Sequence, residues 1–211
     1  MHERPALSQP ELLPLPDGVA SERLLVRRYR PGDGEAFFCG LAPHRDELMR
    51  WLPWPQNHQQ LADSESYAVR LHAQFALREG LAMGIWSTDG QFLGGSGFHA
   101  PDWKTPKAAI GYFLLPTARG RGYATEAVRL LVHYAFDHMA LNRVWATCDA
   151  DNAASTNVLR RAGLPEEGRL RAETRDHHGR LRDTLMFGLG ARDYPAWREG
   201  HGVGSLRYLD T

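Results

Sequence analysis

The chain has 211 residues, 43% of them apolar and 24% charged, which fits one well-buried globular domain and leaves little room for a second. Lys plus Arg balance Asp plus Glu at 25 each, so no global field favours nucleic acid or an anionic membrane as a partner. The two cysteines lack metal-type spacing, which predicts reduced thiols. The sequence shows no signal-peptide pattern and no apolar run near the roughly 20 residues of a membrane span, so we expect a soluble, cytoplasmic protein.

The N-terminal segment, residues 1–20, is expected to be a tail. Its prolines block both helix and central strand, so the segment is either disordered or wrapped on the surface. They are Pro5, Pro10, Pro14 and Pro16. One folded domain is expected over residues 21–190. Residues 191–211 are expected to form one short helical turn and then a loose tail that contains several glycines.

Hydrophobic periodicity and turn residues define the elements of the first half. In chain order they are a strand at 23–29, helices at 34–41 and 43–49, a helix at 63–79 capped by Asp63 and Ser64, and strands at 81–88 and 91–99 joined by an Asp89-Gly90 turn. Glycines at 94, 95 and 97 weaken the last strand and indicate a bulge or a close backbone approach.

The stretch Trp51-Leu52-Pro53-Trp54-Pro55 cannot be regular helix, because two prolines interrupt it. It brings two large aromatic side chains to a loop, where they are candidates for a substrate-binding wall. Two tryptophans that plug the edge of the core would give the same sequence, and the pattern does not choose between these interpretations.

The second half is organised around a strand, a glycine loop and a strongly periodic helix. Its expected elements are a strand at 110–115, a helix from Tyr123 to about Met139, a strand at 143–148, a helix at 153–162, and a hairpin of strands 168–174 and 181–189 turning at His177-His178-Gly179. The paired histidines have no second ligand group at a recognisable metal spacing, so we predict a turn there and no metal.

The loop Arg119-Gly120-Arg121-Gly122 opens the long helix and predicts a phosphate site. Free backbone N–H groups and the positive end of the helix dipole favour an anion there, and glycines let its oxygens approach the main chain. The chain lacks the P-loop lysine, and Thr125 stands where the dinucleotide fingerprint needs its third glycine.

The loop does match Arg-x-x-Gly-x-Ala, at Arg119, Gly122 and Ala124, and so resembles the GNAT superfamily of N-acetyltransferases, which bind the pyrophosphate of acetyl-CoA with this pattern. Further stretches resemble the RimJ/RimL branch, which acetylates protein N-terminal amines and related amines. They are Ile110-Gly111-Tyr112, Gly122–Ala127, Leu141-Asn142-Arg143, Asn152–Ser155, Val158-Leu159 and Glu167–Arg171. The similarity covers roughly residues 24–189.

The resemblance implies a mixed α/β (α+β) fold, with a mostly antiparallel sheet of six to seven strands that splits at the cofactor site and is flanked by helices. The ligand would be acetyl-CoA, with an amine acceptor: a protein N-terminus or a small amine. Its binding residues would be Phe113, Leu114, Leu115, Arg119, Gly120, Arg121, Gly122, Tyr123, Ala124, Thr125, Asn152 and Ser155. Dimerisation is an expectation from fold analogy alone.

The resemblance also implies that Ser155 gives a proton to the departing thiolate and that Asn152 contacts the pantetheine arm. Helix capping explains the same two residues, and both roles can coexist. Family members often carry a glutamate where this chain has Ala109, which leaves Glu173 and His99 as candidate bases.

Ordinary surface roles are the alternative for Glu173 and His99. Trp51, Trp54 and Tyr112 are the candidate acceptor-binding residues. A member of the fold that binds acyl-CoA without turnover, as a sensor or structural module, is the alternative function.

Overall fold

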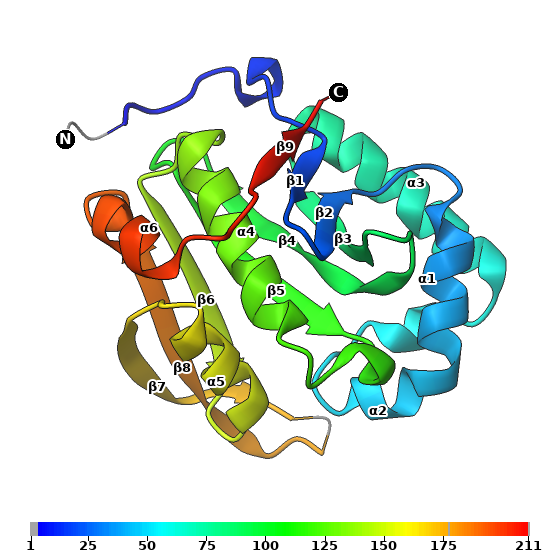
Figure 1. The fold of residues 1–211 in the computed structure, drawn as a ribbon. Coiled ribbons are helices and arrows are strands. Elements are labelled where there is room, and N and C mark those ends of the chain that lie inside the picture. The colour runs from blue at the N-terminus through cyan, green and yellow to red at the C-terminus, as the bar shows by residue number, and fades with distance from the viewer. Residues whose placement is uncertain (1–3, 177, 211) are drawn as a thin grey trace.

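The computed structural model describes residues 4–176 and 178–210, and within them the chain builds one nine-stranded sheet with helices on both faces (Figure 1). His177, expected in the hairpin turn, lies outside the described residues. The strand order is β7-β8-β6-β5-β4-β3-β2-β1-β9. The strands are β1 (Gly18–Ala20), β2 (Leu24–Arg28), β3 (Leu81–Ser87), β4 (Phe92–Asp102), β5 (Lys107–Leu114), β6 (Arg143–Asp149), β7 (Glu166–Arg175), β8 (Leu181–Gly190) and β9 (Arg207–Leu209).

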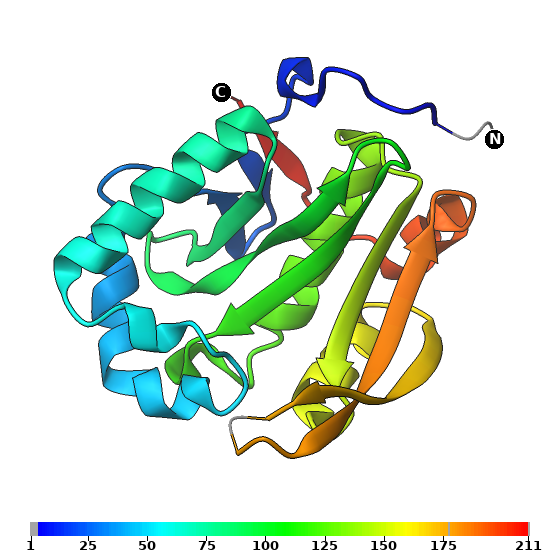
Figure 2. The same ribbon diagram turned by 180° about the vertical axis from the view of Figure 1, so that it is seen from behind.

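Six α-helices flank this sheet, and Figure 2 shows the face opposite to that of Figure 1. The helices α4, α5 and α6 lie on one face, and α1 and α3 lie on the other. Their bounds are α1 (Asp33–Leu41), α2 (Arg45–Met49), α3 (Leu61–Leu77), α4 (Tyr123–Asp137), α5 (Ala153–Arg161) and α6 (Tyr194–His201). No helix of the described residues is long and apolar enough to cross a bilayer.

Every neighbouring pair of strands is antiparallel except β5 and β6, which run parallel. This parallel ladder has only three residue pairs, from Lys107↔Arg143 to Ala109↔Trp145. Beyond it, β5 stays paired with β4 and β6 stays paired with β8, so the sheet opens between β5 and β6. The expected mostly antiparallel, split sheet is confirmed, and the gap is the feature that positions the site.

Both ends of the chain are structured, which favours the surface-wrapped alternative for the N-terminal segment and corrects the expectations of a loose C-terminal tail and of six to seven strands. β1 lies between β2 and β9, so both terminal segments extend the sheet. The N-terminal prolines do not prevent this, because Pro16 stands just before the strand and removes no ladder hydrogen bond. α6 is a regular eight-residue helix whose Trp197 is buried.

Two apolar clusters fill the two sides of the sheet. The larger cluster surrounds α4, in which nine residues are buried. A helix on the surface of a sheet exposes its outer face to solvent, but α5 and α6 cover that face of α4. The smaller cluster joins α1 and α3 to the sheet through Phe37, Leu71 and Phe92. α3 begins at Leu61, two residues before the expected cap, because Gln60 and Asp63 form a reciprocal capping box.

Two glycines of β4 make the close backbone approaches that the sequence suggested. A Cβ on Gly94 would lie 2.1 Å from the carbonyl oxygen of Phe113, and one on Gly97 would lie 2.3 Å from that of Leu81. The ladder with β3 is also irregular beside Gly94, because Ile85 pairs with Gly94 and Trp86 with Phe92, which leaves Leu93 of β4 as an extra residue. These glycines therefore let β4 lie tightly against both neighbours and support the edge of β5 that faces the gap.

Candidate active site

The loop between β5 and α4 is built for an anion. A short 3₁₀ helix, Pro116–Ala118, leads into two glycines with left-handed backbone, Gly120 at φ 76° and Gly122 at φ 81°. Gly122 is the N-cap of α4 and supplies no side-chain cap, which leaves N–H groups of the first turn unbonded. A Cβ on Gly120 would meet nothing within 4 Å, so this side of the loop is open to a ligand.

Arg23 and Glu126 brace this loop from the side. The Glu126 carboxylate, in the first turn of α4, accepts hydrogen bonds from Arg23 and, at 2.6 Å, from the Ser21 hydroxyl. Arg23 in turn donates to the Arg121 carbonyl at 3.2 Å and lies over the Tyr123 ring. Glu126 therefore has the structural role expected of a first-turn carboxylate.

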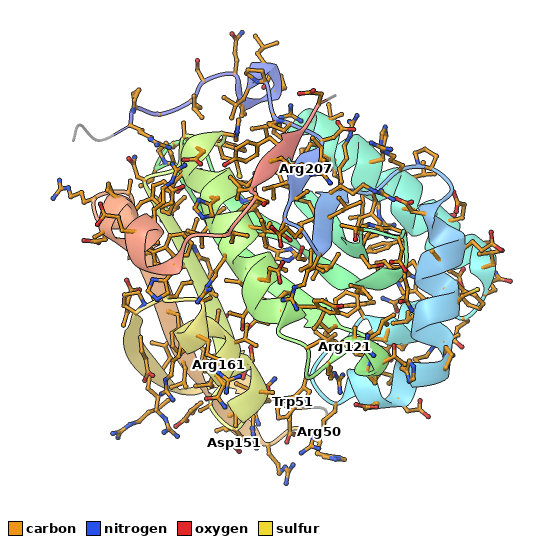
Figure 3. All side chains as sticks on the ribbon, in the orientation of Figure 1. Arg50, Trp51, Arg121, Asp151, Arg161 and Arg207 are labelled. Carbon is orange, nitrogen blue, oxygen red and sulfur yellow. The ribbon has the colours of Figure 1, made fainter. Side chains whose placement is uncertain are left out.

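The two loop arginines differ in their surroundings. Arg119 is ion-paired with Glu47 of α2, and both side chains are about half exposed. A pair at such exposure is screened by water and is worth little, so a phosphate can replace the carboxylate at small cost. Arg121 is exposed on the same loop, and Figure 3 places it on the approach to α4.

A cleft of about 1090 Å³ follows the gap between β5 and β6 and reaches the loop. Most of the predicted ligand-binding residues line it: Phe113, Leu114, Arg119, Gly120, Gly122, Tyr123, Ala124, Thr125, Asn152 and Ser155. Leu115 does not, because its side chain is buried and its N–H bonds to the Leu93 carbonyl at 2.9 Å. Arg121 is also outside the lining set.

Three polar groups meet where α5 approaches β5. Asn152 is the N-cap of α5, and its side-chain oxygen accepts from the Ser155 N–H at 3.1 Å. The Ser155 hydroxyl lies 2.8 Å from the Tyr112 hydroxyl, which also donates to the Ser155 carbonyl at 3.1 Å. Asn152 thus caps α5 through the Ser155 backbone N–H, while the Ser155 hydroxyl stays at the cleft.

Tyr112 keeps its proton at all ordinary pH values. Burial raises the pKa of the Tyr112 phenol, and the hydrogen bond with Ser155 only partly opposes this. The phenol is therefore a hydrogen-bond donor that orients Ser155. The sequence assigned Tyr112 to the acceptor wall, and its pairing with Ser155 depends on a contact between segments 43 residues apart.

The two candidate bases lie in different places. Glu173, on β7, lines the cleft, is exposed and makes no hydrogen bond or ion pair through its side chain with the other described residues. His99, on β4, lies outside the cleft, and its ring covers Gly111, where a Cβ would stand 2.5 Å from its Nε2. Desolvation lowers the pKa of His99. The structure brings Glu173 to the site and leaves His99 beside β5.

The two tryptophans of the Trp-Leu-Pro-Trp stretch also separate. Trp51 lines the cleft, is 39% exposed and has the Arg50 guanidinium 5.1 Å from its ring centre. Trp54 is outside the cleft lining and packs against Phe113 and Phe37, with ring centres 5.0 and 5.9 Å away. Trp51 is placed as a wall of the cleft and Trp54 as a plug at the edge of the smaller cluster.

The comparisons with known proteins agree with this geometry. Residues 23–165 match the model of the acetyltransferase (GNAT) domain family. The chain belongs to the GNAT family of acetyltransferases. It is 31% identical to the uncharacterized N-acetyltransferase YoaA of Bacillus subtilis over 154 residues, 72% of this chain and 85% of the relative.

One further relative supports the RimJ/RimL-like branch, and one solved structure shows the shared fold. The ribosomal-protein-serine acetyltransferase of Escherichia coli is 27% identical over 124 residues, 59% of this chain and 69% of that protein. The structure of Mycobacterium smegmatis RimJ in complex with CoA-disulfide superposes with a TM-score of 0.75 at 24% identity, covering 93% of this chain and 98% of that one. The latter likeness shows the shared GNAT fold.

Within this GNAT domain, Cys148 is a cleft residue that the sequence did not single out. It lies on β6, is 8% exposed and lines the cleft. Its sulfur is 3.5 Å from the Thr156 hydroxyl, and burial raises the pKa of its thiol, so it is held as a neutral thiol. In the sequence, one cysteine in a strand indicates a small apolar residue. Its position at the cleft becomes visible only from the packing of α5 on β6.

Beside Cys148, the β6 wall of the acetyltransferase is charged but internally paired. Arg182 of β8 donates two hydrogen bonds to Asp149, at 2.9 and 3.0 Å, and these hold the pKa of that carboxyl below its usual range. No group of three His, Cys, Asp or Glu side chains suited to a metal occurs in residues 4–176 and 178–210.

Proposed function

We propose that this protein transfers an acetyl group from acetyl-CoA to a primary amine, an α-amine at a protein N-terminus being the preferred acceptor. The observation that carries the proposal is one continuous cleft with an anion-binding helix start at one end and the Ser155–Tyr112 hydroxyl pair within it. Acetyl-CoA carries a diphosphate and a reacting thioester in one molecule. The helix start would bind the diphosphate, and the hydroxyl pair would serve the thioester.

The pantetheine arm is proposed to lie in the gap as an added strand. Successive residues of a strand direct their backbone groups to opposite sides. The Leu115 N–H points to β4. The backbone groups of Leu114 and Tyr112, one and three residues earlier, therefore point to the other side, into the gap. Amides of the arm would pair with them as in other strand-addition complexes, while the loop before α4 holds the diphosphate.

The chemistry is direct attack of the amine on the thioester. The amine nitrogen bonds to the carbonyl carbon, a backbone N–H of β5 stabilises the oxyanion, and the carbon–sulfur bond then breaks. The departing thiolate takes a proton from the Ser155 hydroxyl, which Tyr112 orients and whose proton is restored from solvent. No covalent bond to the enzyme forms in this sequence.

Glu173 is the proposed base. An α-amine titrates near 8, so a large part is already neutral at physiological pH and a modest base is enough to remove the proton lost during attack. Glu173, on β7, and Trp51 both line the cleft. A carboxylate and an aromatic side chain would then flank the entering amine.

A protein N-terminus fits the open form of this cleft better than a small enclosed ligand does. Trp51 and Leu170 line the cleft and are each 39% exposed, which offers apolar contacts to residues that follow the amine. The E. coli relative acts, by its name, on a ribosomal protein. The β7–β8 hairpin and the α2 loop would form the two sides of a peptide channel.

The test is thiol release from acetyl-CoA against N-terminal peptides, polyamines, amino sugars and aminoglycosides, with CoA binding measured in parallel by calorimetry. Acetylation of peptides at the α-amine, confirmed by mass spectrometry, is the expected result. Turnover only with a small amine would contradict the peptide acceptor and keep the acetyltransferase. Tight CoA binding with no turnover of any acceptor would instead favour a non-catalytic acyl-CoA sensor.

A further inference from the structure

Four arginines line the cleft from two segments that are far apart in the sequence. Arg50 comes from the loop after α2, and Arg175, Arg180 and Arg182 come from the β7–β8 hairpin. Figures 1 and 2 both show the end of β7 and the start of β8 next to the segment that follows α2. This part of the cleft therefore receives positive charge from both of the segments that would form the peptide channel.

Two of these four arginines are neutralised by acids of the protein itself. Arg182 is ion-paired with Asp149 at 2.9 Å, and Arg180 is ion-paired with Asp176 at 2.8 Å. Both of these acids also line the cleft, so each pair presents little net charge to a ligand. The other two arginines have no acidic partner in residues 4–176 and 178–210.

Arg50 and Arg175, the two arginines without an acid, are exposed and are held by uncharged groups. The Arg50 guanidinium lies 5.1 Å from the centre of the Trp51 ring, and Figure 3 shows these two side chains next to each other. Arg175 donates from Nη1 to the Gly179 carbonyl at 2.7 Å. A guanidinium has five N–H donors, so each arginine keeps its charge and further donors for an anion in the cleft.

The position of Arg175 relative to Glu173 sets a spacing. The two residues are separated by one residue on β7, and both line the cleft. A strand rises by roughly 3.3 Å per residue, so they are about 7 Å apart along it. An extended peptide advances by the same amount per residue. With its amine at Glu173, its second and third side chains would reach the level of Arg175.

We propose that Arg50 and Arg175 select acceptor peptides that carry Asp or Glu at the second or third position. The inference rests on the proposed function. A carboxylate there would accept charge-assisted hydrogen bonds from the two guanidinium groups, whereas a Lys or Arg would be repelled. Glu173, the unpaired acid of this part of the cleft, would face the amine rather than the acidic side chain.

The experiment measures kcat/KM of the full chain with two octapeptides that differ only at the second and third positions. One begins Ser-Asp-Glu and the other Ser-Asn-Gln, so they differ in charge and hardly in shape. The wild-type protein should use the acidic peptide with about tenfold higher kcat/KM, the combined scale of two exposed charge pairs. The difference should lie mainly in KM and should shrink at high salt.

Substitution of the two arginines tests their part in this preference. Arg50→Gln and Arg175→Gln should each reduce it to about threefold, and the double variant should abolish it. Arg171→Gln is the matched control, because it removes the same charge from an exposed residue of β7 that does not line the cleft. Its preference should stay near the wild-type value.

Equal use of the two peptides by the wild-type protein would overturn the assignment. A preference that survives in the double variant, or that is lost equally in Arg171→Gln, would do the same. If the wild-type protein acetylates neither peptide, the peptide acceptor of the proposed function fails as well. That outcome is distinct from the others, because it appears as absent turnover and not as a ratio near one.

Discussion

Ser155 combines two tasks that use different atoms of one residue. Its backbone N–H is bonded by the Asn152 side chain and so belongs to the start of α5, whereas its hydroxyl bonds Tyr112 across the gap. The start of α5 therefore holds the Ser155 hydroxyl within hydrogen-bond distance of Tyr112 on β5. A side chain on a loop would be positioned less well for proton transfer.

Replacing Ser155 with alanine is expected to separate these tasks. The capping bond to the backbone N–H survives in Ser155→Ala, so the fold should be kept. The CoA affinity should change less than twofold. Loss of the proton donor should lower kcat by about 100-fold, the low end for general acid catalysis. Steady-state kinetics with calorimetry provides the measurement.

Tyr112→Phe is the companion variant, because it removes the partner and keeps the serine hydroxyl. A loss of about tenfold in kcat is expected there, as for one orienting hydrogen bond. An unaltered rate constant in Ser155→Ala would assign the residue to capping alone.

The site residues that were predictable from the sequence lie close together along the chain. The glycine loop and the start of α5 are each a few consecutive residues, and their geometry follows from local backbone rules. The roles of Trp54, His99 and Cys148 were not predictable in this way, because each depends on which distant element covers it. Trp54 does not line the cleft, because it packs against Phe37 and Phe113 instead.

At the scale of elements, α6 is the attachment that joins the C-terminal segment to the body of the protein. Trp197 is 5% exposed, and its ring stacks on Tyr194 and His201. Below the helix, Asp137 at the end of α4 accepts hydrogen bonds from the Tyr194 and Tyr208 hydroxyls, at 2.9 and 2.6 Å. α6 and β9 are thereby tied to the same carboxylate.

Trp197→Ala should destabilise the protein by about 3 kcal/mol, because truncation of a buried tryptophan leaves a cavity. It also removes the hydrogen bond to the Ala162 carbonyl. Urea unfolding gives the free energy, and Trp51→Ala, at a site that is 39% exposed, is the control that should stay within about 1 kcal/mol of wild type. Similar losses in both variants would contradict a structural role for α6.

The longer elements followed from the sequence, whereas the shortest did not. β3, β4 and α4 carry a period and clear turn or cap residues over seven or more positions. β1 and β9 have three residues each, too few for any period, and they form because β1 pairs with β2 and β9 then pairs with β1 at the edge of the sheet. Long-range pairing of this kind has no local signature.

For the whole molecule, buried histidines set the response to acid. His58 and His133 are 4% and 2% exposed, and burial lowers the pKa of each. The unfolded chain, with an ordinary histidine pKa near 6.5, therefore binds more protons below that pH than the folded protein does. Stability contributed by the neutral rings is full above pH 6.5 and is lost as the pH falls below it.

The free energy of unfolding is accordingly expected to fall between pH 7 and pH 5. Carboxylates such as Asp149, whose pKa is lowered by Arg182, lose their contribution only at more acidic pH, so this window isolates the histidines. His133→Gln should flatten the pH dependence. Urea titrations at four pH values measure it, and an unchanged slope in the variant would exclude His133 as a contributor.

The gap between β5 and β6 gives the sheet an edge in its interior as well as at its rims. Backbone groups that face the gap have no strand partner beyond Ala109 and Trp145. Such an edge attracts any extended chain that reaches it. A donor bound there would therefore serve as a protective cap as well as a substrate, and an acetyltransferase deprived of it would be the form most prone to self-association.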